Sequence, residues 1–233
     1  MGYTIIIPYR DREEHLSSLL PRLEELMQGE QYEIIVTEQD DTTKFKKNIL
    51  YNVAAQQAKY DTLIFHDVDY YPGDNVSYKT EPNVPLYPVR QVLFLGSDNE
   101  PLPIDKVPAG YRQFSQDVGN HSGGVFVMSK QIFEDIKGFN PYYFGWGKED
   151  DDTRDRVAIK GYKWHRNDIG SFFALYHEPI GNLDNDPDWH NNNNVYGNYR
   201  EYLDKGYADC DANVDEYDMN GVRWLKLTNL TVK

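Results

Sequence analysis

The sequence is poor in cysteine, in long apolar runs and in positive charge. Its 233 residues include one cysteine, Cys210, so no disulfide can form within the chain, which fits a reducing compartment. The apolar run at residues 3–8 is too short to be a membrane span or a secretion signal. Lysine and arginine number 24 against 38 acidic residues, and a net charge of −14 disfavours nucleic acid and anionic membranes as partners. We therefore expect a cytoplasmic protein without a membrane span.

Hydrophobic residues make up 39% of the chain, which is enough for one large core. In the first third, short apolar runs alternate with stretches of helical periodicity. The runs predict strands at residues 3–8, 32–37 and 62–65, and the stretches between them predict helices around 16–27 and 44–58. Pro21 should kink or break the first helix. Strands alternating with helices in this way predict an α/β fold with a mainly parallel central sheet flanked by helices.

The rest of the chain is less regular. Residues 73–113 favour loops with room for a hairpin, and residues 179–198 are so polar that we expect a mobile loop there. Asn220-Gly221 between two apolar runs predicts a hairpin. We further expect the following strands and helices: strands at 125–128 and 172–177, and helices at 130–137, 153–159 and 199–205.

Charged residues follow two of the predicted strands. Arg10 and Arg12 come after the first strand and Asp67 and Asp69 after the third, so both pairs should lie at the ligand-binding edge of a parallel sheet. Two carboxylates there could hold Mg²⁺ or Mn²⁺, and two guanidinium groups could grip a diphosphate. The alternatives are a turn for the aspartates and surface ion pairs for the arginines. His177, at the end of another predicted strand, could add a metal ligand or be structural.

The segment Phe144–Asp152 combines a Gly-Trp-Gly motif with four consecutive acids. Acids in the first turn of a helix are stabilised by unpaired backbone N–H groups, which accounts for one or two of the four. Four acids after two glycines suggest that some of them point into a cleft. A capped helix with no further role remains the alternative.

Two other features could contact a base with its phosphate, or a sugar. Phe45 could stack on a base while Lys47 pairs with phosphate, although Phe45 could equally be a core residue. Gly123 and Gly124 allow close backbone approach to a sugar, but a glycine pair is more often just part of a loop.

Taken together and in order, these motifs resemble those of the β-1,4-galactosyltransferases and their N-acetylgalactosaminyl relatives, glycosyltransferase family seven. The resemblance extends from about residue 4 to the C-terminal hairpin. It implies a single GT-A domain over residues 1–233, with a nucleotide-binding half at 1–120 and an acceptor-binding half at 121–233. It also implies an inverting transfer from a UDP-sugar donor, with Mn²⁺ or Mg²⁺, to a glycan or glycoconjugate acceptor. The stretches that carry it are Ile5 to Leu16, Phe45 to Val53, Asp67-Val68-Asp69, Gly123-Gly124-Val125 and Gly145 to Asp152.

The resemblance also implies roles for individual residues. It places the nucleotide against Pro8, Tyr9, Arg10 and Arg12, uracil on Phe45, the diphosphate on Lys47, the ribose at Asp67, and the metal on Asp69 and His177. It places the sugars against His121, Gly123, Gly124, Trp146, Glu149, Asp150 and Asp151, with Asp150 as the base beside Glu149. It also places Trp146 against the donor phosphate. The segment at 179–198 would close over bound donor.

Three departures from the family pattern matter. Lys47 replaces the usual arginine, Ala174 replaces a methionine metal ligand, and His121 stands where an aromatic usually narrows the donor pocket. The donor sugar therefore stays open between galactose, N-acetylgalactosamine and glucose. The vertebrate enzymes' anchor and disulfides are not seen, which suggests a bacterial or viral form. The alternatives are a non-catalytic carbohydrate-binding module and a glycoside hydrolase.

Overall fold

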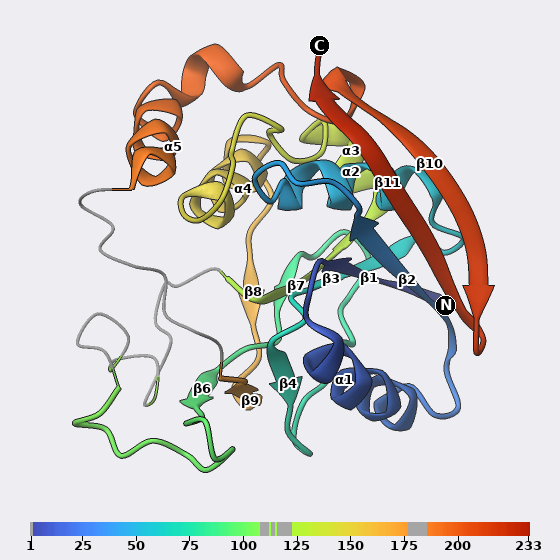
Figure 1. The fold of residues 1–233 in the computed structure, drawn as a ribbon, viewed down its shortest axis with the longest axis vertical. Coiled ribbons are helices and arrows are strands. Elements are labelled where there is room, and N and C mark those ends of the chain that lie inside the picture. The colour runs from blue at the N-terminus through green and yellow to red at the C-terminus, as the bar shows by residue number, and fades with distance from the viewer. Residues whose placement is uncertain (1, 108–111, 113–114, 116–122, 177–185) are drawn as a thin grey trace.

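The computed structural model describes residues 2–107, 112, 115, 123–176 and 186–233. Within these residues the strands and helices alternate as expected over the first third of the chain (Figure 1). The elements are β1 Gly2–Tyr9, α1 Glu13–Leu26, β2 Gln31–Gln39, α2 Lys47–Gln57, β3 Thr62–His66, β4 Tyr70–Pro72, β5 Leu86–Tyr87, β6 Gln91–Phe94, β7 Val125–Ser129, α3 Lys130–Asp135, α4 Glu149–Ile159, β8 His165–Arg166, β9 Ser171–Ala174, α5 Pro187–Gly197, the 3₁₀ helices η3 Tyr199–Tyr202 and η4 Tyr207–Asp209, β10 Cys210–Met219 and β11 Val222–Val232.

The central sheet has the strand order β10-β11-β2-β1-β3-β7-β5-β8. Strands β11, β2, β1 and β3 are parallel to their neighbours in that run, whereas β7 and β10 pair in the antiparallel direction. A second, three-stranded sheet has the order β4-β9-β6. The α/β prediction with a mostly parallel sheet is therefore confirmed.

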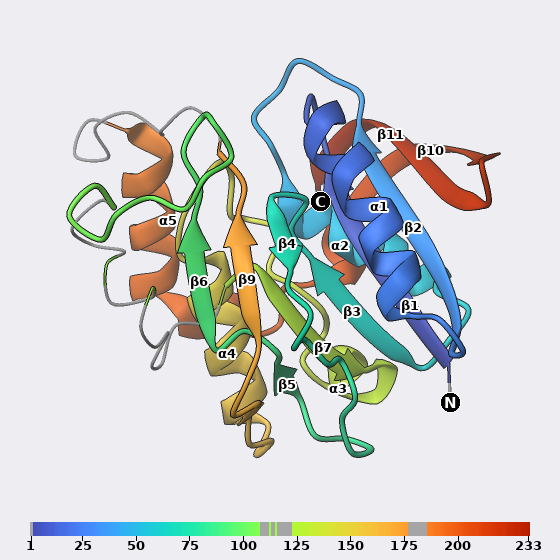
Figure 2. The same cartoon turned by 90° about the horizontal axis from the view of Figure 1, so that it is seen from below.

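Helices cover both faces of the central sheet. Helix α1 lies on one face, and α2, α3 and α4 lie on the other (Figures 1 and 2). Strand β1 explains the division, because alternate side chains of a strand point to opposite faces. Ile5 and Ile7 join the core beneath α1, while Ile6 joins the core beneath α2 and α3.

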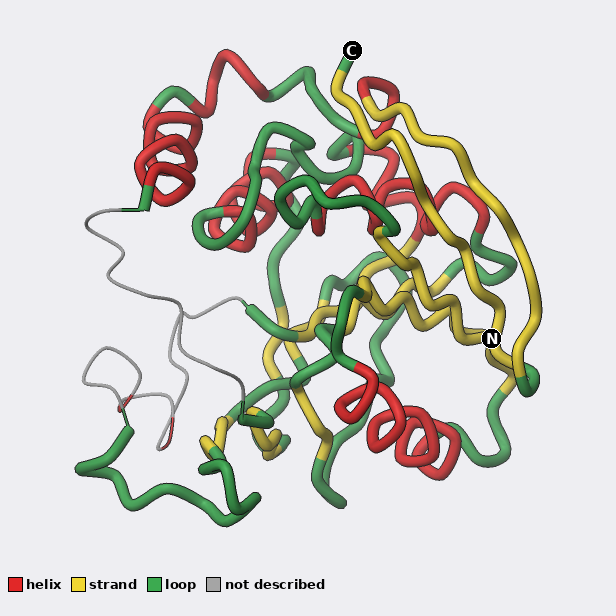
Figure 3. The backbone as a smooth tube through the Cα atoms, viewed as in Figure 1, coloured by secondary structure: helices red, strands yellow, loops and turns green. Residues whose placement is uncertain are grey.

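Several expectations needed correction. Helix α1 continues through Pro21, because Leu16, Leu19 and Leu23 pack it onto the sheet while the exposed Pro21 faces solvent. In 73–113 the local hairpin is limited to an antiparallel bridge between Leu95 and Pro101, whereas β5 pairs with β7 and β8, and β6 pairs with β9. Strand β9 ends at Ala174, earlier than expected. Part of the polar segment at 179–198 forms helix α5 (Figure 3).

The predicted C-terminal hairpin is present, and it extends the central sheet. Asn220 adopts a left-handed conformation with a φ of 58° in the turn between β10 and β11. Strand β11 then pairs with β2 in parallel, which brings Trp224 against Tyr9 at the end of β1. No helix within the described residues has both the length and the apolar character needed to cross a membrane.

Candidate functional site

The ends of β3 and α2 place a lysine among three carboxylates. The Lys47 ammonium lies 2.9 Å from Glu149, 3.3 Å from Asp150 and 3.4 Å from Asp67. Its side chain is only 13% exposed, so these contacts are shielded from solvent. The fold thus brings the end of β3 and the acidic segment together, with Lys47 as the common partner. We call these four residues the Lys47 cluster.

Burial and charge act in opposite directions on this cluster. Burial alone would lower the pKa of Lys47, but the Asp150, Asp67 and Glu149 carboxylates outweigh it and hold that pKa well above its ordinary value. Burial raises the pKa of Asp150 well above the usual carboxyl range, with Lys47 opposing the rise and Glu149 and Asp67 adding to it. Burial raises the pKa of Asp67 too, again against Lys47, and the charge of Asp69 adds to the rise. The cluster therefore holds carboxyl groups that take up protons more readily than exposed ones.

Asp67 is held in place from two sides. The Tyr51 hydroxyl donates to its carboxylate at 2.8 Å, and its backbone N–H donates to the Gly124 carbonyl at 2.7 Å. Gly124 has a φ of 79°, and a Cβ added there would lie 2.2 Å from the Tyr70 ring. The neighbouring Gly123 is buried. Packing against Tyr70 is thus enough to require glycine at 124, and a role for the pair in binding sugar stays a prediction.

The four acids of the 144–152 segment have different surroundings. Helix α4 begins at Glu149, earlier than expected, so all four lie in its first turn. Glu149 and Asp150 face Lys47, whereas Asp151 pairs with Lys148 and Arg154 at 3.1 and 2.8 Å. Asp152 is buried and pairs with Arg156 at 2.6 Å. The site role predicted for Asp151 is therefore not accompanied by a contact to Lys47, and Asp152 has a structural role.

The residues expected around a nucleotide base lie beside the Lys47 cluster. The Arg10 guanidinium lies 5.2 Å from the centre of the Phe45 ring and donates to the Thr43 carbonyl at 2.6 Å. Phe45 is only partly buried: it packs against the core, and part of its side chain stays accessible, so both base stacking and a core role fit its position. Arg12 is exposed next to the first turn of α1.

The other two residues expected around the nucleotide are tied into the fold. Pro8 is buried within β1. Tyr9 packs edge-to-face on Trp224 with ring centres 5.6 Å apart. These contacts give both residues a structural role, and their contact with a nucleotide stays a prediction.

Helix α5 is packed onto the Gly-Trp-Gly segment. Asn192 is fully buried and donates to the carbonyls of Phe144 and Trp146 at 2.8 and 3.1 Å. Trp189 stacks on Trp146 with ring centres 5.4 Å apart. The expectation of a mobile loop was therefore wrong for residues 187–197, which form a helix in which Asn192 bonds to the backbone of another segment. Closure of the 179–198 segment over a donor stays a prediction, and its first part lies outside the described residues.

Backbone conformation at Gly147 makes the contact with α5 possible. Its φ is 104°, and an added Cβ would lie 2.6 Å from the Trp189 ring. We expect Gly147→Ala to lower stability by about 2 kcal/mol, through both the strained φ and the clash. Gly161→Ala is the matched control, because Gly161 has a φ of 86° with open space around it. Thermal unfolding of both variants measures the difference in stability. Equal losses of stability would mean that Trp189 of α5 does not pack tightly against Gly147.

The predicted metal ligands can be placed only in part. Asp69 follows β3, and its carbonyl accepts a hydrogen bond from the Leu175 N–H at 2.8 Å. His177, two residues further on, lies outside the described residues, as does His121. Within the part of the chain that is described, no group of three or more His, Cys, Asp or Glu side chains is gathered to hold a metal ion.

Sequence reasoning missed three residues of this site. Tyr51 is four positions after Lys47, so one helical turn puts both on the same face of α2, and that spacing was a usable signal. Trp189 and Asn192 carry no local signal, because only the packing of α5 on a distant segment gives them a role.

Family models match both halves of the chain. The N-terminal region of glycosyl transferase group 7 matches residues 2–80, and the N-terminal domain of galactosyltransferase matches residues 111–178. Human beta-1,4-galactosyltransferase 4 is 33% identical over 183 residues, covering 74% of this chain and 48% of the relative. Mouse beta-1,4-galactosyltransferase 5 is 33% identical over 190 residues, covering 77% of this chain and 44% of the relative. The chain thus spans about half the length of the curated relatives it matches.

A solved structure supports the same fold. The crystal structure of a variant of Drosophila beta-1,4-galactosyltransferase 7, in complex with manganese, UDP-Gal and xylobiose, aligns with a TM-score of 0.69. The alignment covers 100% of this chain and 94% of the other at 22% identity. At that identity the likeness establishes the GT-A fold.

Proposed function

Because the chain belongs to the glycosyl transferase group 7 family, we propose that it transfers a hexose from a UDP-sugar to a sugar hydroxyl, with inversion and with a metal ion. The observation that carries this proposal is the Lys47 cluster. One ammonium group lies between Asp67 at the end of β3 and Glu149 and Asp150 at the start of α4. The cluster thus joins the strand end expected to bind donor to the helix start expected to bind acceptor.

The donor side consists of residues suited to a nucleotide diphosphate. Phe45 offers an aromatic face for uracil, and Arg10 and Lys47 offer cations near it. Lys47 pairs with three carboxylates, so a diphosphate would compete with them for its charge. The galactose donor bound by the Drosophila relative makes UDP-galactose the first candidate, with UDP-N-acetylgalactosamine and UDP-glucose as alternatives.

The residues present fit a hard divalent cation such as Mn²⁺ or Mg²⁺. Asp67 and Asp69 supply carboxylate oxygens, and the charge of Asp69 adds to the raised pKa of Asp67, so a cation there would relieve their repulsion. We propose Asp69 and His177 as its ligands, and Leu175, hydrogen-bonded to Asp69, brings the chain to within two residues of His177. When bound, the ion would neutralise charge on the departing diphosphate.

On the acceptor side we propose Asp150 as the general base. Its carboxylate takes the proton of the acceptor hydroxyl while that oxygen forms a bond to the anomeric carbon and the bond from that carbon to UDP breaks. Burial raises the pKa of Asp150, which makes it a stronger base than an exposed aspartate, and Lys47 opposes the rise. We place the acceptor ring against Trp146, whose ring is stacked on Trp189.

A screen for UDP release tests the function directly. The protein would be incubated with UDP-galactose, UDP-N-acetylgalactosamine or UDP-glucose, with Mn²⁺ or Mg²⁺ and a panel of sugar acceptors. We expect release that depends on acceptor and stops when a chelator is added. Sugar binding without UDP release would indicate a carbohydrate-binding module. Glycoside hydrolysis that survives chelation would indicate a hydrolase, and either outcome would contradict the proposal.

A further inference from the structure

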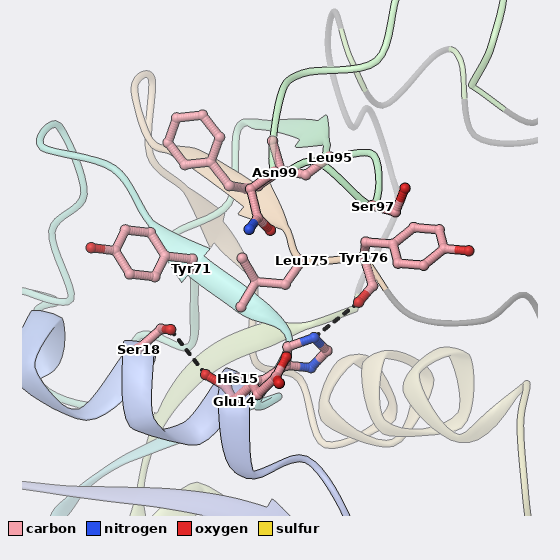
Figure 4. A pocket seen from close by; sticks show the side chains of 10 residues that line it. Glu14, His15, Ser18, Tyr71, Leu95, Ser97, Asn99, Leu175 and Tyr176 are labelled. Carbon is pink, nitrogen blue, oxygen red and sulfur yellow. Dashed lines mark hydrogen bonds between the residues drawn. The ribbon is translucent and has the colours of Figure 1, made fainter.

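A cavity opens on the α1 side of the molecule, and none of the four residues of the Lys47 cluster is among its described lining residues. It has a volume of about 520 Å³ and is lined by α1, β4, the turn after β6 and the end of β9. In Figure 4, the Asn99 amide and the Leu175 side chain project into the space between Tyr71 and Tyr176. This volume lies in the range of sites that bind small ligands.

The end of β9 and the residues after it form one wall of this cavity. Phe173 and Leu175 both line the cavity. Side chains of a strand alternate between its two faces, so Ala174 between them faces the opposite side. Ala174 is the position at which the family's metal methionine would stand. The part of the cavity formed by Phe173 and Leu175 therefore lies on the face of this segment opposite Ala174, while Tyr176, next to the proposed ligand His177, also lines the cavity.

The chemistry of the lining indicates what the cavity would accept. Among the described residues that line the cavity, Glu14 is the only Asp, Glu, Lys or Arg. A phosphate or other anion is therefore disfavoured. The Asn99 amide and the Tyr71 hydroxyl can donate to and accept from hydroxyl groups, and the Ser18 hydroxyl, which donates to the Glu14 carbonyl, can accept from them. Phe173 offers an apolar face. We propose that this cavity binds a neutral sugar residue.

Hydrogen bonds connect the cavity to the proposed metal site. The Nε2 atom of His15 lies 2.9 Å from the Tyr176 carbonyl, and because a carbonyl only accepts, Nε2 is the donor. The Leu175 N–H donates to the Asp69 carbonyl at 2.8 Å. A sugar in the cavity would therefore touch the same short segment that is bonded to Asp69. It would be either a distal residue of the acceptor glycan, which rests on the proposed function, or a free saccharide.

Two neighbouring serines of α1 give a matched pair of variants. Ser17 and Ser18 are both exposed, and both hydroxyls donate to the Glu14 carbonyl, at 3.0 and 2.9 Å. Only Ser18 lines the cavity. Ser18→Trp should fill the cavity, whereas Ser17→Trp adds the same side chain outside it. Asn99→Gly removes the amide without strain, because Asn99 has a φ of 62° that glycine adopts freely.

Binding of lactose, N-acetyllactosamine, maltose and xylobiose would be measured by calorimetry and saturation-transfer NMR, without UDP or metal. We expect at least one of them to bind the wild-type protein and Ser17→Trp equally, and to bind Ser18→Trp about tenfold or more weakly. Asn99→Gly should weaken binding in the same direction. No binding to the wild type by any of these sugars, or equal loss in the two tryptophan variants, would overturn the inference.

Transfer kinetics then distinguish the two sources of the sugar. If Ser18→Trp raises KM for acceptors of three or more sugars and not for monosaccharides, the cavity holds the acceptor chain. If binding falls in Ser18→Trp but KM is the same for all acceptors, the cavity holds a free saccharide. UDP release with a monosaccharide acceptor reports on the proposed function alone, so failure of that function leaves the direct binding measurements interpretable.

Discussion

Replacing Asp150 with asparagine is expected to lower the transfer rate about 1,000-fold while UDP binding stays near the wild-type level. The variant keeps the shape of the side chain and a hydrogen-bond acceptor for Lys47, which lies 3.3 Å from Asp150. It cannot take a proton from the acceptor hydroxyl. UDP release with saturating acceptor measures the first effect, and calorimetric titration with UDP and Mn²⁺ measures the second.

Asp155→Asn is the matched control for this experiment. Asp155 lies on the same helix and pairs with Arg154 and Tyr196, outside the Lys47 cluster. Its transfer rate should stay within about threefold of wild type, as expected of a surface change. Near-normal turnover in Asp150→Asn would remove Asp150 as the base and leave Glu149 as the next candidate.

The Asp150→Asn variant should also be more stable than wild type at neutral pH when no donor or metal is added. The folded state raises the pKa of Asp150, so the folded protein binds that proton more readily than the unfolded chain. Stability from this group is present below the unfolded pKa and is lost as pH rises through the higher folded pKa. The gain from asparagine should therefore appear at neutral pH and vanish in acid, as thermal unfolding at several pH values would detect.

Lys47→Met is expected to reduce both UDP affinity and transfer by about 100-fold or more and to lower stability at pH 7 by about 3 kcal/mol. Without the ammonium, Asp67, Glu149 and Asp150 have no cation to offset their repulsion in a site where the lysine is only 13% exposed. The stability loss should shrink as pH falls, because protonating the carboxylates removes the repulsion. Denaturant unfolding across this pH range, together with UDP titration, measures both effects.

Two further variants separate charge from position. Lys47→Arg keeps the cation and has the residue usual in the family pattern, so it should retain most UDP binding. Lys46→Met removes the adjacent lysine, whose ammonium donates to the Leu230 carbonyl at 2.5 Å and contacts none of the three carboxylates. If Lys47→Met bound UDP as well as Lys46→Met does, the diphosphate role of Lys47 would be wrong.

The local pattern of apolar and polar residues was enough to predict the strands and helices in the first third of the chain. The strands β1, β2 and β3 and the helices between them follow from apolar runs and helical spacing, which are local properties of the chain. Because parallel strands end at one edge, the same pattern also predicted that Arg10 and Asp67 lie on the ligand-binding side. The convergence of the acidic segment on Asp67 came from the family resemblance, since the two are 82 positions apart.

Helix α5 shows why the remainder could not be predicted in this way. Four consecutive asparagines have weak helical preference and no apolar face, so the local sequence favours a loop. The helix forms where Asn192 satisfies the carbonyls of Phe144 and Trp146, and Trp189 stacks on Trp146. Those partners are more than 40 residues away in the chain.

The sequence by itself determined the α/β class, the hairpin at Asn220 and the residue types available for binding a nucleotide sugar, because each of these depends on near neighbours or on composition. Only the tertiary structure decided how the four acids divide their roles, with Glu149 and Asp150 on Lys47, Asp151 on Arg154 and Asp152 buried on Arg156. The physical reason is that adjacent residues of a helix point about 100° apart, so their surroundings are set by whatever distant segments pack on each side.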